Sequence, residues 1–291
     1  MDEGFCWSVK TMINKELLKK RFSTNARNYD QYASVQKRMA HQLIHLLQKR
    51  KPQDQAEIHI LEVGCGTGNL TEQVLNQFPQ AHLTAVDLAP GMIEIAKERV
   101  KARRVQFYCG DIEEMQLNRN YDLILSNATF QWFNQPRSTI QYLYSLLNEN
   151  GAIYFSTFGN RTFYELHTSF QHALHHLGLK GDHSPGQSFF SLNELIELCH
   201  QAARKWEGSE EWQVNGKECM EIERFHSVKD FFTSIRKIGA NNSNQNEYCQ
   251  RPSVFKEMIK IYESDFRQGN QIEATYHCLY LSIEKSKRDK G

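Results

Sequence analysis

The segment Ile58-His-Ile-Leu-Glu-Val-Gly-Cys-Gly-Thr-Gly68 joins an apolar run to three closely spaced glycines, and it decides the fold. Gly64, Gly66 and Gly68 form a Gly-x-Gly-x-Gly pattern, and a helical pattern begins directly after them. In parallel α/β sheets, a strand that ends in such a turn before a helix brings bare main chain against a nucleotide-like ligand. The dinucleotide fingerprint needs its third glycine one residue later, so the spacing disfavours a nicotinamide cofactor.

Strand and helix patterns alternate on both sides of this turn. Short apolar and β-branched runs predict strands at 58–63, 82–87, 105–109, 121–126 and 152–157, and helices at 69–77, 91–101 and 137–147. Such alternation indicates βαβ crossovers and a parallel sheet. We therefore expect an α/β fold with a Rossmann-like, doubly wound and mostly parallel sheet of seven strands.

The flanking sequence predicts elements that cover this sheet. Two helices are expected within 14–50, further helices near 162–177, 191–203, 227–238 and 252–266, strand structure over 208–225, and a last strand at 274–283. The polar stretch 240–246 is typical of a loop. The expected division is a non-essential leader at 1–11, an N-terminal helical lid at 12–54, a ligand-binding core at 55–160, and substrate-lid elements with the closing strands of the same domain at 161–291.

Composition narrows the classes of function. The 291 residues are 40% hydrophobic and carry a formal net charge of +1, which favours neither nucleic acid nor an anionic membrane as partner. The sequence contains no apolar run of transmembrane length and no signal-peptide core. Seven scattered cysteines indicate reduced thiols and a cytoplasmic location. His172, His175 and His176 share helical spacing, but no nearby Cys or Asp completes a metal site, so we expect none.

Four loops are expected to meet at the carboxyl ends of neighbouring strands, where open α/β sheets bind ligands. The first is the glycine turn, with the acid Glu62 just before it. Asp87 ends the second strand, and its carboxylate can accept hydrogen bonds from both hydroxyls of a ribose. Asp111, after the third strand, can accept from an adenine amino group. The fourth loop, 126–132, would lie beside the reacting group.

The predicted ligand-binding residues come from these loops and from the helix after the second strand. They are Glu62, Gly64, Cys65, Gly66, Gly68, Asp87, Leu88, Met92, Asp111, Ile112, Asn127 and Gln131. Met92 can pack against a flat purine, and the Ile112 amide can face a ring nitrogen. Alone, Asp87 and Asp111 could be helix caps and Met92 a core residue, but in this order the set indicates a nucleoside site.

The same pieces resemble the motif set of class I S-adenosylmethionine-dependent methyltransferases over about residues 55–158. The shared features are Glu62 with the short glycine spacing, Asp87, Gly110-Asp111-Ile112 and Tyr121-Asp-Leu-Ile124. The resemblance implies S-adenosylmethionine as methyl donor and S-adenosylhomocysteine as product. Amino-adenine DNA methyltransferases carry two prolines after the Asn or Asp of the fourth loop, whereas Ala128 and Thr129 follow Asn127 here, which disfavours base methylation.

The sequence outside this core is similar to the malonyl-acyl-carrier-protein O-methyltransferases of biotin synthesis. The opening stretch Phe22-Ser-Thr-Asn-Ala-Arg-Asn-Tyr-Asp-Gln-Tyr-Ala-Ser-Val-Gln36 looks like their first motif. Further matches are Ser126-Asn127, Gln131-Trp132, Thr157-Phe158, Glu165-Leu166-His167, Phe170, Ser234–Ala240 and Thr275-Tyr276-His277. The resemblance implies methyl transfer to the free carboxylate of a malonyl thioester, giving the methyl ester that primes pimeloyl synthesis for biotin.

A carboxylate acceptor is already ionised at neutral pH, so its attack on a sulfonium methyl needs no base. The enzyme would align nucleophile, methyl and sulfur and exclude water. It needs a group that holds the carboxylate without quenching its charge. The candidates are Tyr29, which the resemblance places over the cofactor, and His167, Tyr276, His277, Arg161 and Arg236, each of which could instead be a packing or surface residue.

The resemblance implies malonyl-acyl-carrier protein, or malonyl-coenzyme A, as the partner. An acidic carrier predicts a basic patch, for which Lys19-Lys20-Arg21, Lys37-Arg38 and Arg236-Lys237 are candidates. Three alternatives stay open: a methyltransferase for a small free acid of the trans-aconitate type or another small molecule, a non-catalytic S-adenosylmethionine-binding regulator, and a nicotinamide dehydrogenase. The sequence leaves the oligomeric state open.

Overall fold

The structure is a computed structural model that describes residues 12–48, 57–179, 185–204, 210–240 and 251–287. The expected leader at 1–11 and almost all of the expected loop at 240–246 lie outside the described residues. The strands are β1 (His59–Val63), β2 (His82–Asp87), β3 (Val105–Cys109), β4 (Tyr121–Asn127), β5 (Leu147–Phe158), β6 (Glu210–Phe225), β7 (Arg267–Gln268) and β8 (Gln271–Lys287).

The helices follow the expected ranges closely. They are α1 (Lys15–Tyr32), α2 (Ser34–Leu47), α3 (Asn69–Gln77), α4 (Pro90–Arg99), the short 3-10 helix η1 (Phe130–Trp132), α5 (Pro136–Ser145), α6 (Tyr164–His176), α7 (Leu192–Ala203), α8 (Val228–Lys237) and α9 (Pro252–Asp265). Local signals explain several boundaries. The Asn14 side chain accepts a hydrogen bond from the Leu17 amide at the start of α1, and Ser191 and Glu194 form a capping box at the start of α7.

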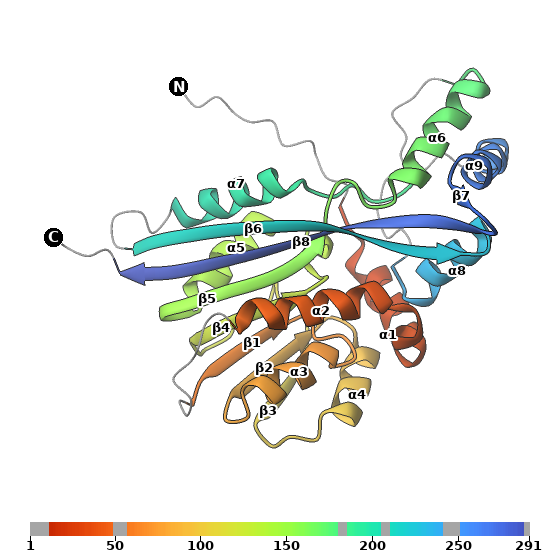
Figure 1. Ribbon diagram of the computed structural model, residues 1–291. Coiled ribbons are helices and arrows are strands. Elements are labelled where there is room, and N and C mark those ends of the chain that lie inside the picture. The colour runs from red at the N-terminus through yellow and green to blue at the C-terminus, as the bar shows by residue number, and fades with distance from the viewer. Residues whose placement is uncertain (1–11, 49–56, 180–184, 205–209, 241–250, 288–291) are drawn as a thin grey trace, which may run out of the picture.

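One mixed sheet runs through the molecule in the order β3-β2-β1-β4-β5-β8-β6 (Figure 1). Neighbouring strands from β3 to β5 are parallel, and β8 is antiparallel to both β5 and β6. The two-residue strand β7 pairs with the start of β8. The prediction of a Rossmann-like, mostly parallel seven-stranded sheet is therefore confirmed, with β7 as a short addition.

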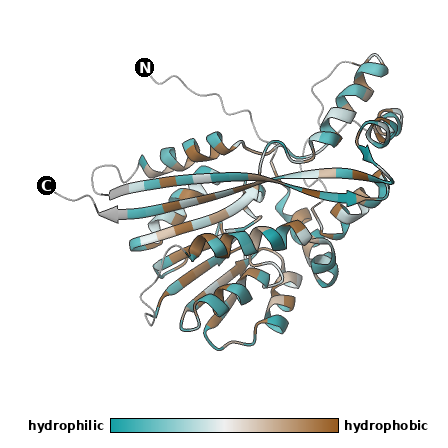
Figure 2. Ribbon diagram, viewed as in Figure 1, coloured by the Kyte–Doolittle hydropathy of each residue, from teal (hydrophilic) through white to brown (hydrophobic). Residues whose placement is uncertain are grey.

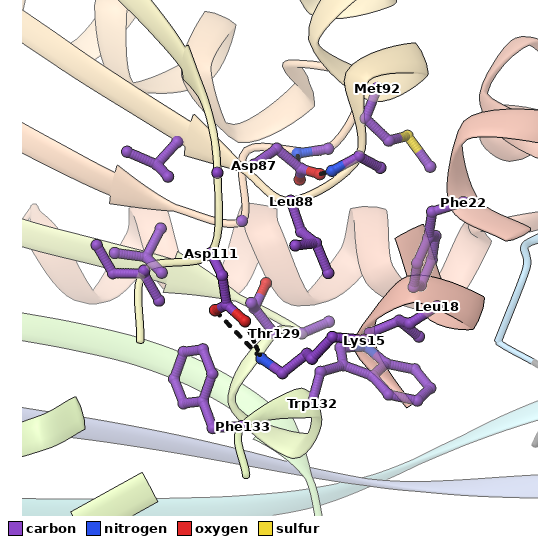
Figure 3. A pocket seen from close by; sticks show the side chains of 18 of the residues that line it. Lys15, Leu18, Phe22, Asp87, Leu88, Met92, Asp111, Thr129, Trp132 and Phe133 are labelled. Carbon is purple, nitrogen blue, oxygen red and sulfur yellow. Dashed lines mark hydrogen bonds and ion pairs between the residues drawn. The ribbon is translucent and has the colours of Figure 1, made fainter. Parts of the chain in front are cut away.

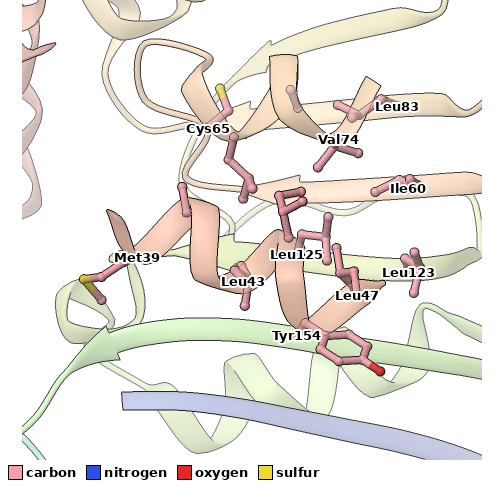
Figure 4. Close-up of a cluster of buried hydrophobic side chains, with 14 of the residues drawn as sticks. Met39, Leu43, Leu47, Ile60, Cys65, Val74, Leu83, Leu123, Leu125 and Tyr154 are labelled. Carbon is pink, nitrogen blue, oxygen red and sulfur yellow. The ribbon is translucent and has the colours of Figure 1, made fainter. Parts of the chain in front are cut away.

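Helices cover both faces of this sheet. Alternation along β1 sends Ile60 to one face and Leu61 to the other. On the Ile60 side, Met39, Leu43 and Leu47 of α2 pack with side chains of α3 and of the parallel strands (Figure 4). The Leu61 side is covered by α5 and α7. Figure 2 shows apolar residues concentrated along the inner strands and hydrophilic residues on the outer helix surfaces.

A third cluster lies at the far end of the β6–β8 pair. Leu166 and Phe170 of α6 pack there with Phe231 of α8 and Met258 of α9. The pairing of β6 with β8 runs from Glu210 to Phe225 without a shift in register, and this ribbon extends toward α8 and α9 in Figure 1. The ribbon thus carries a helical cap beyond the edge of the parallel sheet. No helix in the described part of the chain is long and apolar enough to cross a membrane.

Two strands are longer than their sequence patterns predicted. β5 begins at Leu147 rather than 152, because Asn148-Glu-Asn-Gly151, which looks like a turn, is accommodated by a register shift against β4 between Tyr121 and Leu123. β8 begins at Gln271, beside β7, and continues along β6. Pairing with β4, for β5, and with β6 and β7, for β8, makes these strands longer than their local sequence propensity indicates.

Candidate cofactor and acceptor pockets

The glycine turn adopts the backbone that its sequence predicted. Gly64, Gly66 and Gly68 have φ angles of +74°, +55° and +81°, which other residues rarely adopt. A Cβ on Gly64 would lie 2.1 Å from the Thr129 Oγ1 atom, whereas a Cβ on Gly66 would meet nothing within 4 Å. The turn therefore packs tightly against the fourth loop at Gly64 and presents bare main chain to open space at Gly66.

Asp87 ties the second strand to this turn. Its carboxylate accepts hydrogen bonds from the Gly66 amide at 2.8 Å and from the Ala89 amide at 2.8 Å. Burial raises the pKa of Asp87 to about 6, although the two amide hydrogen bonds act in the opposite direction and lower it. Each carboxylate oxygen keeps a lone pair for a further donor, because two oxygens offer about four acceptor sites.

A pocket opens where these loops meet. Figure 3 shows Asp87, Leu88 and Met92 on one side of it and Asp111 below them. Ile112 and Asn127 also line the pocket. The structure thus brings most of the predicted cofactor residues to one cavity, as their order along the chain predicted.

The remaining predicted cofactor residues lie around this pocket. Glu62 and Cys65 line a smaller hollow beside the glycine turn, which also contains Tyr29, Gly66 and Asn127. Gly68, at the start of α3, packs against the Ala96 backbone of α4. The absence of a side chain at Gly68 lets α3 and α4 approach each other closely. Gln131 lines a second cavity, described below. The Thr157 hydroxyl donates to its Oε1 atom at 2.8 Å.

Glu62 is buried beneath the turn. It is 1% exposed, and its Oε2 atom accepts a hydrogen bond from Thr71 at 2.6 Å. Burial raises the pKa of Glu62 to about 8. Among the described residues, its Oε1 atom has no hydrogen-bond partner. A buried orphan acceptor next to bare glycine backbone fits a ligand that brings its own donor, such as an ammonium group.

Helix α1 closes the pocket from the side opposite the sheet. Leu18, Phe22 and Tyr29 line the cavity from this helix. The Phe22 ring meets the Trp132 ring edge-on with centroids 5.8 Å apart. Burial and the neighbouring Asp87 raise the pKa of Tyr29, so its hydroxyl stays protonated. Tyr29 therefore lies where a cofactor-covering residue was expected.

Two polar contacts fasten α1 to the core. At its end, Asp30 pairs with Arg99 of α4 and accepts from the Thr67 hydroxyl at 2.9 Å. At its start, Lys15 lies 3.0 Å from Asp111 and 2.6 Å from Glu113. Lys15 was not among the predicted site residues. The only signal in the sequence was that its helix was expected to form part of the lid.

The fourth loop carries strain at the junction with a second cavity. Ala128 has a φ of +50°, an unusual value for a residue with a side chain. Asn127 donates to the Gln36 carbonyl at 3.0 Å and accepts from Ser156 at 2.6 Å. Trp132 lines both cavities, so the two are neighbours across its ring. In the sequence, Trp132 stands out only as part of the Gln131-Trp132 motif.

The second cavity, hereafter the acceptor chamber, is larger and mainly apolar. Its walls include Phe158, Phe163, Leu166, Phe189, Phe231, Phe232, Ile235, Ile238 and Ile259. Polar side chains among its lining are Gln36, Gln131, His167, Lys229 and Arg236. The chamber is therefore suited to a slender, mostly apolar substrate arm with a polar tip.

The six predicted acceptor residues divide into three groups. His167, Tyr276 and Arg236 line the acceptor chamber, and Tyr29 lines the cofactor pocket. Burial lowers the pKa of His167, which favours its neutral form, and burial raises the pKa of Tyr276. Arg161 and His277 form a separate cluster with Glu218: the Arg161 Nη2 and Glu218 Oε1 atoms are 2.8 Å apart, and the His277 Nε2 and Glu218 Oε2 atoms 3.0 Å.

Similarity to known proteins agrees with this arrangement. A family model described as a methyltransferase domain matches residues 60–151. The plantazolicin methyltransferase BpumL, solved with a desmethyl substrate analogue and S-adenosylhomocysteine, has a TM-score of 0.53 at 16% identity and covers 94% of this chain and 96% of its own. The YcgJ protein from Bacillus subtilis has a TM-score of 0.56 at 16% identity over 85% of this chain and all of its own. These likenesses concern the fold.

Sequence relatives are much more similar. A malonyl-[acyl-carrier protein] O-methyltransferase from Priestia megaterium is 53% identical over 94% of this chain and 99% of its own length. The enzyme of the same name from Bacillus anthracis is 49% identical over 94% of this chain and 98% of its own. The match includes the N-terminal helices and the helical cap as well as the sheet. The chain therefore belongs to the malonyl-[acyl-carrier protein] O-methyltransferase family.

Proposed function

We propose that this protein transfers a methyl group from S-adenosylmethionine to the free carboxylate of malonyl-acyl-carrier protein. The product is the malonyl methyl ester that primes pimeloyl synthesis for biotin. The observation that carries the proposal is identity of about half the residues, over nearly the whole chain, to proteins named for this reaction. Because that identity spans the elements of the acceptor chamber, it bears on substrate choice as well as on fold.

The residues of the cofactor pocket fit S-adenosylmethionine, which supplies an electrophilic sulfonium methyl group when bound. Asp87 would accept from the ribose hydroxyls with its remaining lone pairs, and Gly66 leaves room for close approach. The orphan Oε1 atom of Glu62 would accept from the amino group of the methionine moiety. Met92 and Phe133 would pack against the adenine.

The chain's part in the chemistry is alignment and exclusion of water. A malonyl carboxylate is ionised at neutral pH, so no residue needs to remove a proton. Phe22, Tyr29 and Trp132 would shield the reacting atoms between the two cavities. Charge is neutralised as carboxylate and sulfonium react, so a low-dielectric setting favours the transition state over the separated charges. The apolar walls of the acceptor chamber provide that setting.

A radiolabel assay tests this function. Purified protein is incubated with S-adenosylmethionine labelled in its methyl group and with malonyl-acyl-carrier protein, and the ester is detected as labelled methanol released by base. We expect labelled ester from the malonyl thioester and little from trans-aconitate. Label transfer to the free acid alone would contradict the proposal, and so would binding of S-adenosylhomocysteine without any turnover of the thioester.

A further inference from the structure

Gln36 stands at the meeting point of the donor and acceptor sides. It lies on α2 and is 8% exposed. It lines the acceptor chamber together with Gln131 and Trp132. It also lines the small hollow beside the glycine turn, together with Tyr29 and Asn127. The Gln36 side chain therefore borders both the glycine turn and the acceptor chamber.

The backbone of Gln36 is held in place, whereas its side chain is not engaged. The Gln36 carbonyl accepts from the Asn127 Nδ2 atom at 3.0 Å, which fixes α2 against the fourth loop. Within the part of the chain that the structure describes, the Gln36 side-chain amide makes no hydrogen bond. Because Gln36 lines both hollows and its amide makes no such bond, the amide is open to a ligand.

The other glutamine amides that line the chamber are already committed, and Gln187 donates from Nε2 to the Gln131 carbonyl at 2.5 Å. Gln131 donates from Nε2 to the Ala128 carbonyl at 2.6 Å, and its Oε1 atom accepts from Thr157. The cations Lys229 and Arg236 line the chamber from exposed positions on α8. Gln36 is thus the better placed of these donors for a group next to the cofactor turn.

We infer that the Gln36 side-chain amide binds and orients the acceptor carboxylate, an inference that rests on the proposed function. One carboxylate oxygen accepts from Nε2, and the other remains free for attack on the methyl carbon. A neutral donor suits this reaction, because an ion pair with Arg or Lys would stabilise the carboxylate before its charge is lost. The Tyr29 hydroxyl, kept protonated by burial, is a second neutral donor lining the same hollow.

This role makes Gln36 a determinant of acceptor specificity. A malonyl thioester offers a terminal carboxylate to the amide, and an acetyl thioester offers none. The ester product accepts more weakly than the charged substrate, because hydrogen bonds to ionised groups are about twice as strong as neutral ones. The same contact therefore favours substrate binding and product release.

The test compares Gln36→Ala and Gln36→Glu with the wild-type protein. We expect kcat/KM for malonyl-pantetheine to fall about 10- to 100-fold in Gln36→Ala, the range for one hydrogen bond to a charged group. Gln36→Glu should fall further, because it places a carboxylate against the substrate's own. S-adenosylhomocysteine affinity, measured by calorimetry, should stay within about twofold of wild type if only acceptor contacts are lost.

A binding measurement isolates the carboxylate contact. In the presence of S-adenosylhomocysteine, wild-type protein should bind malonyl-pantetheine more tightly than acetyl-pantetheine, and Gln36→Ala should lose that preference. Gln42→Glu is the matched control, because Gln42 is an exposed glutamine on the same helix, and it should behave as wild type.

The outcomes separate this inference from the proposed function. If the wild-type protein does not methylate malonyl thioesters, the proposed function fails. If the wild type is active and Gln36→Ala matches it in kcat/KM and in malonyl preference, the inference alone is overturned. A parallel loss of S-adenosylhomocysteine affinity would also overturn it, because Gln36 would then act on the donor side.

Discussion

At the scale of single residues, we expect Asp87 to link proton binding to cofactor binding. Burial raises its pKa from 3.8 to about 6, so in the ligand-free protein the carboxyl is partly protonated in mildly acidic solution. Ribose hydroxyls donate best to the ionised form, and binding below this pKa must therefore release a proton. The affinity for the cofactor product should then depend on pH.

We expect the affinity for S-adenosylhomocysteine to rise from about pH 5 to about pH 7, by up to tenfold per pH unit below the Asp87 pKa. Glu62 has a higher pKa, about 8, so its ionisation on binding would release a second proton throughout this range. Calorimetry in a buffer series measures the effect. In Asp87→Asn the affinity should be lower throughout and should rise less steeply with pH, and a flat wild-type profile would contradict the assignment.

The sequence predicted this part of the site because its residues follow the ends of successive strands. Gly64, Asp87 and Asp111 each lie at or just after the carboxyl end of a predicted strand, and parallel topology brings those ends together. Lys15 and Gln36 lie on helices outside that repeat. Their places depend on how α1 and α2 pack on the core, which no local pattern in the sequence specifies.

At the scale of elements, the fit of α1 against α4 depends on a glycine. A Cβ on Gly91 would lie 2.6 Å from the Ser23 carbonyl oxygen of α1. The Gly91 amide also donates to the Ser23 hydroxyl at 3.4 Å. Because backbone is on both sides of this contact, a methyl group can be accommodated only if one helix moves.

Gly91→Ala should therefore weaken the closure of the cofactor pocket. Helix propensity alone would favour alanine by about 0.5–1 kcal/mol, but overpacking costs about 1–3 kcal/mol, so displacement of α1 should prevail. We expect the KM for S-adenosylmethionine to rise roughly tenfold, and α1 to become more sensitive to limited proteolysis. Glu94→Ala, an exposed change on the same helix, is the control and should leave both measurements unchanged.

Element prediction succeeded where local and tertiary preferences agree. The expected range of α3, 69–77, matches the structure, because a glycine turn precedes it and its apolar residues share one face. For β5, the residues Asn148–Gly151 favour a turn locally, and pairing with β4 overrides that preference. The length of β8 likewise depends on its pairing with β5 and β6, which are distant in sequence.

At the scale of the whole molecule, cationic residues gather at the exposed edge of the acceptor chamber. Lys229 and Arg236 lie seven residues apart on α8, and both line the chamber. Gly239 packs against the Arg21 backbone, which brings the Lys19–Arg21 segment of α1 close to the end of α8. By contrast, Arg38 pairs with Glu221, so the Lys37-Arg38 part of the predicted patch is partly neutralised.

Charge reversal at Lys229 and Arg236 should distinguish carrier recognition from recognition of the acyl group. With both changed to Glu, we expect kcat/KM for malonyl-acyl-carrier protein to fall about tenfold or more and to depend less on ionic strength, because these charges would attract an acidic carrier. Malonyl-N-acetylcysteamine, which has no carrier, should react nearly as before. An equal loss with this small substrate would show that Arg236 contacts the acyl carboxylate.

The matched control reverses two cations elsewhere. Lys101 and Arg103 are exposed between α4 and β3, at the opposite edge of the sheet from β6. Changing both to Glu alters the net charge by the same amount. Activity on the carrier-bound substrate should then stay near the wild-type value.

The long β6–β8 ribbon has a consequence for how such enzymes diverge. It bears the helices that wall the acceptor chamber, whereas the glycine turn, Asp87 and Asp111 rest on β1, β2 and β3. Mutations accumulating along the ribbon after gene duplication would alter which acid is esterified while leaving the methyl source unchanged. New substrate preferences can thus arise without rebuilding the strands that carry the glycine turn and the two acids.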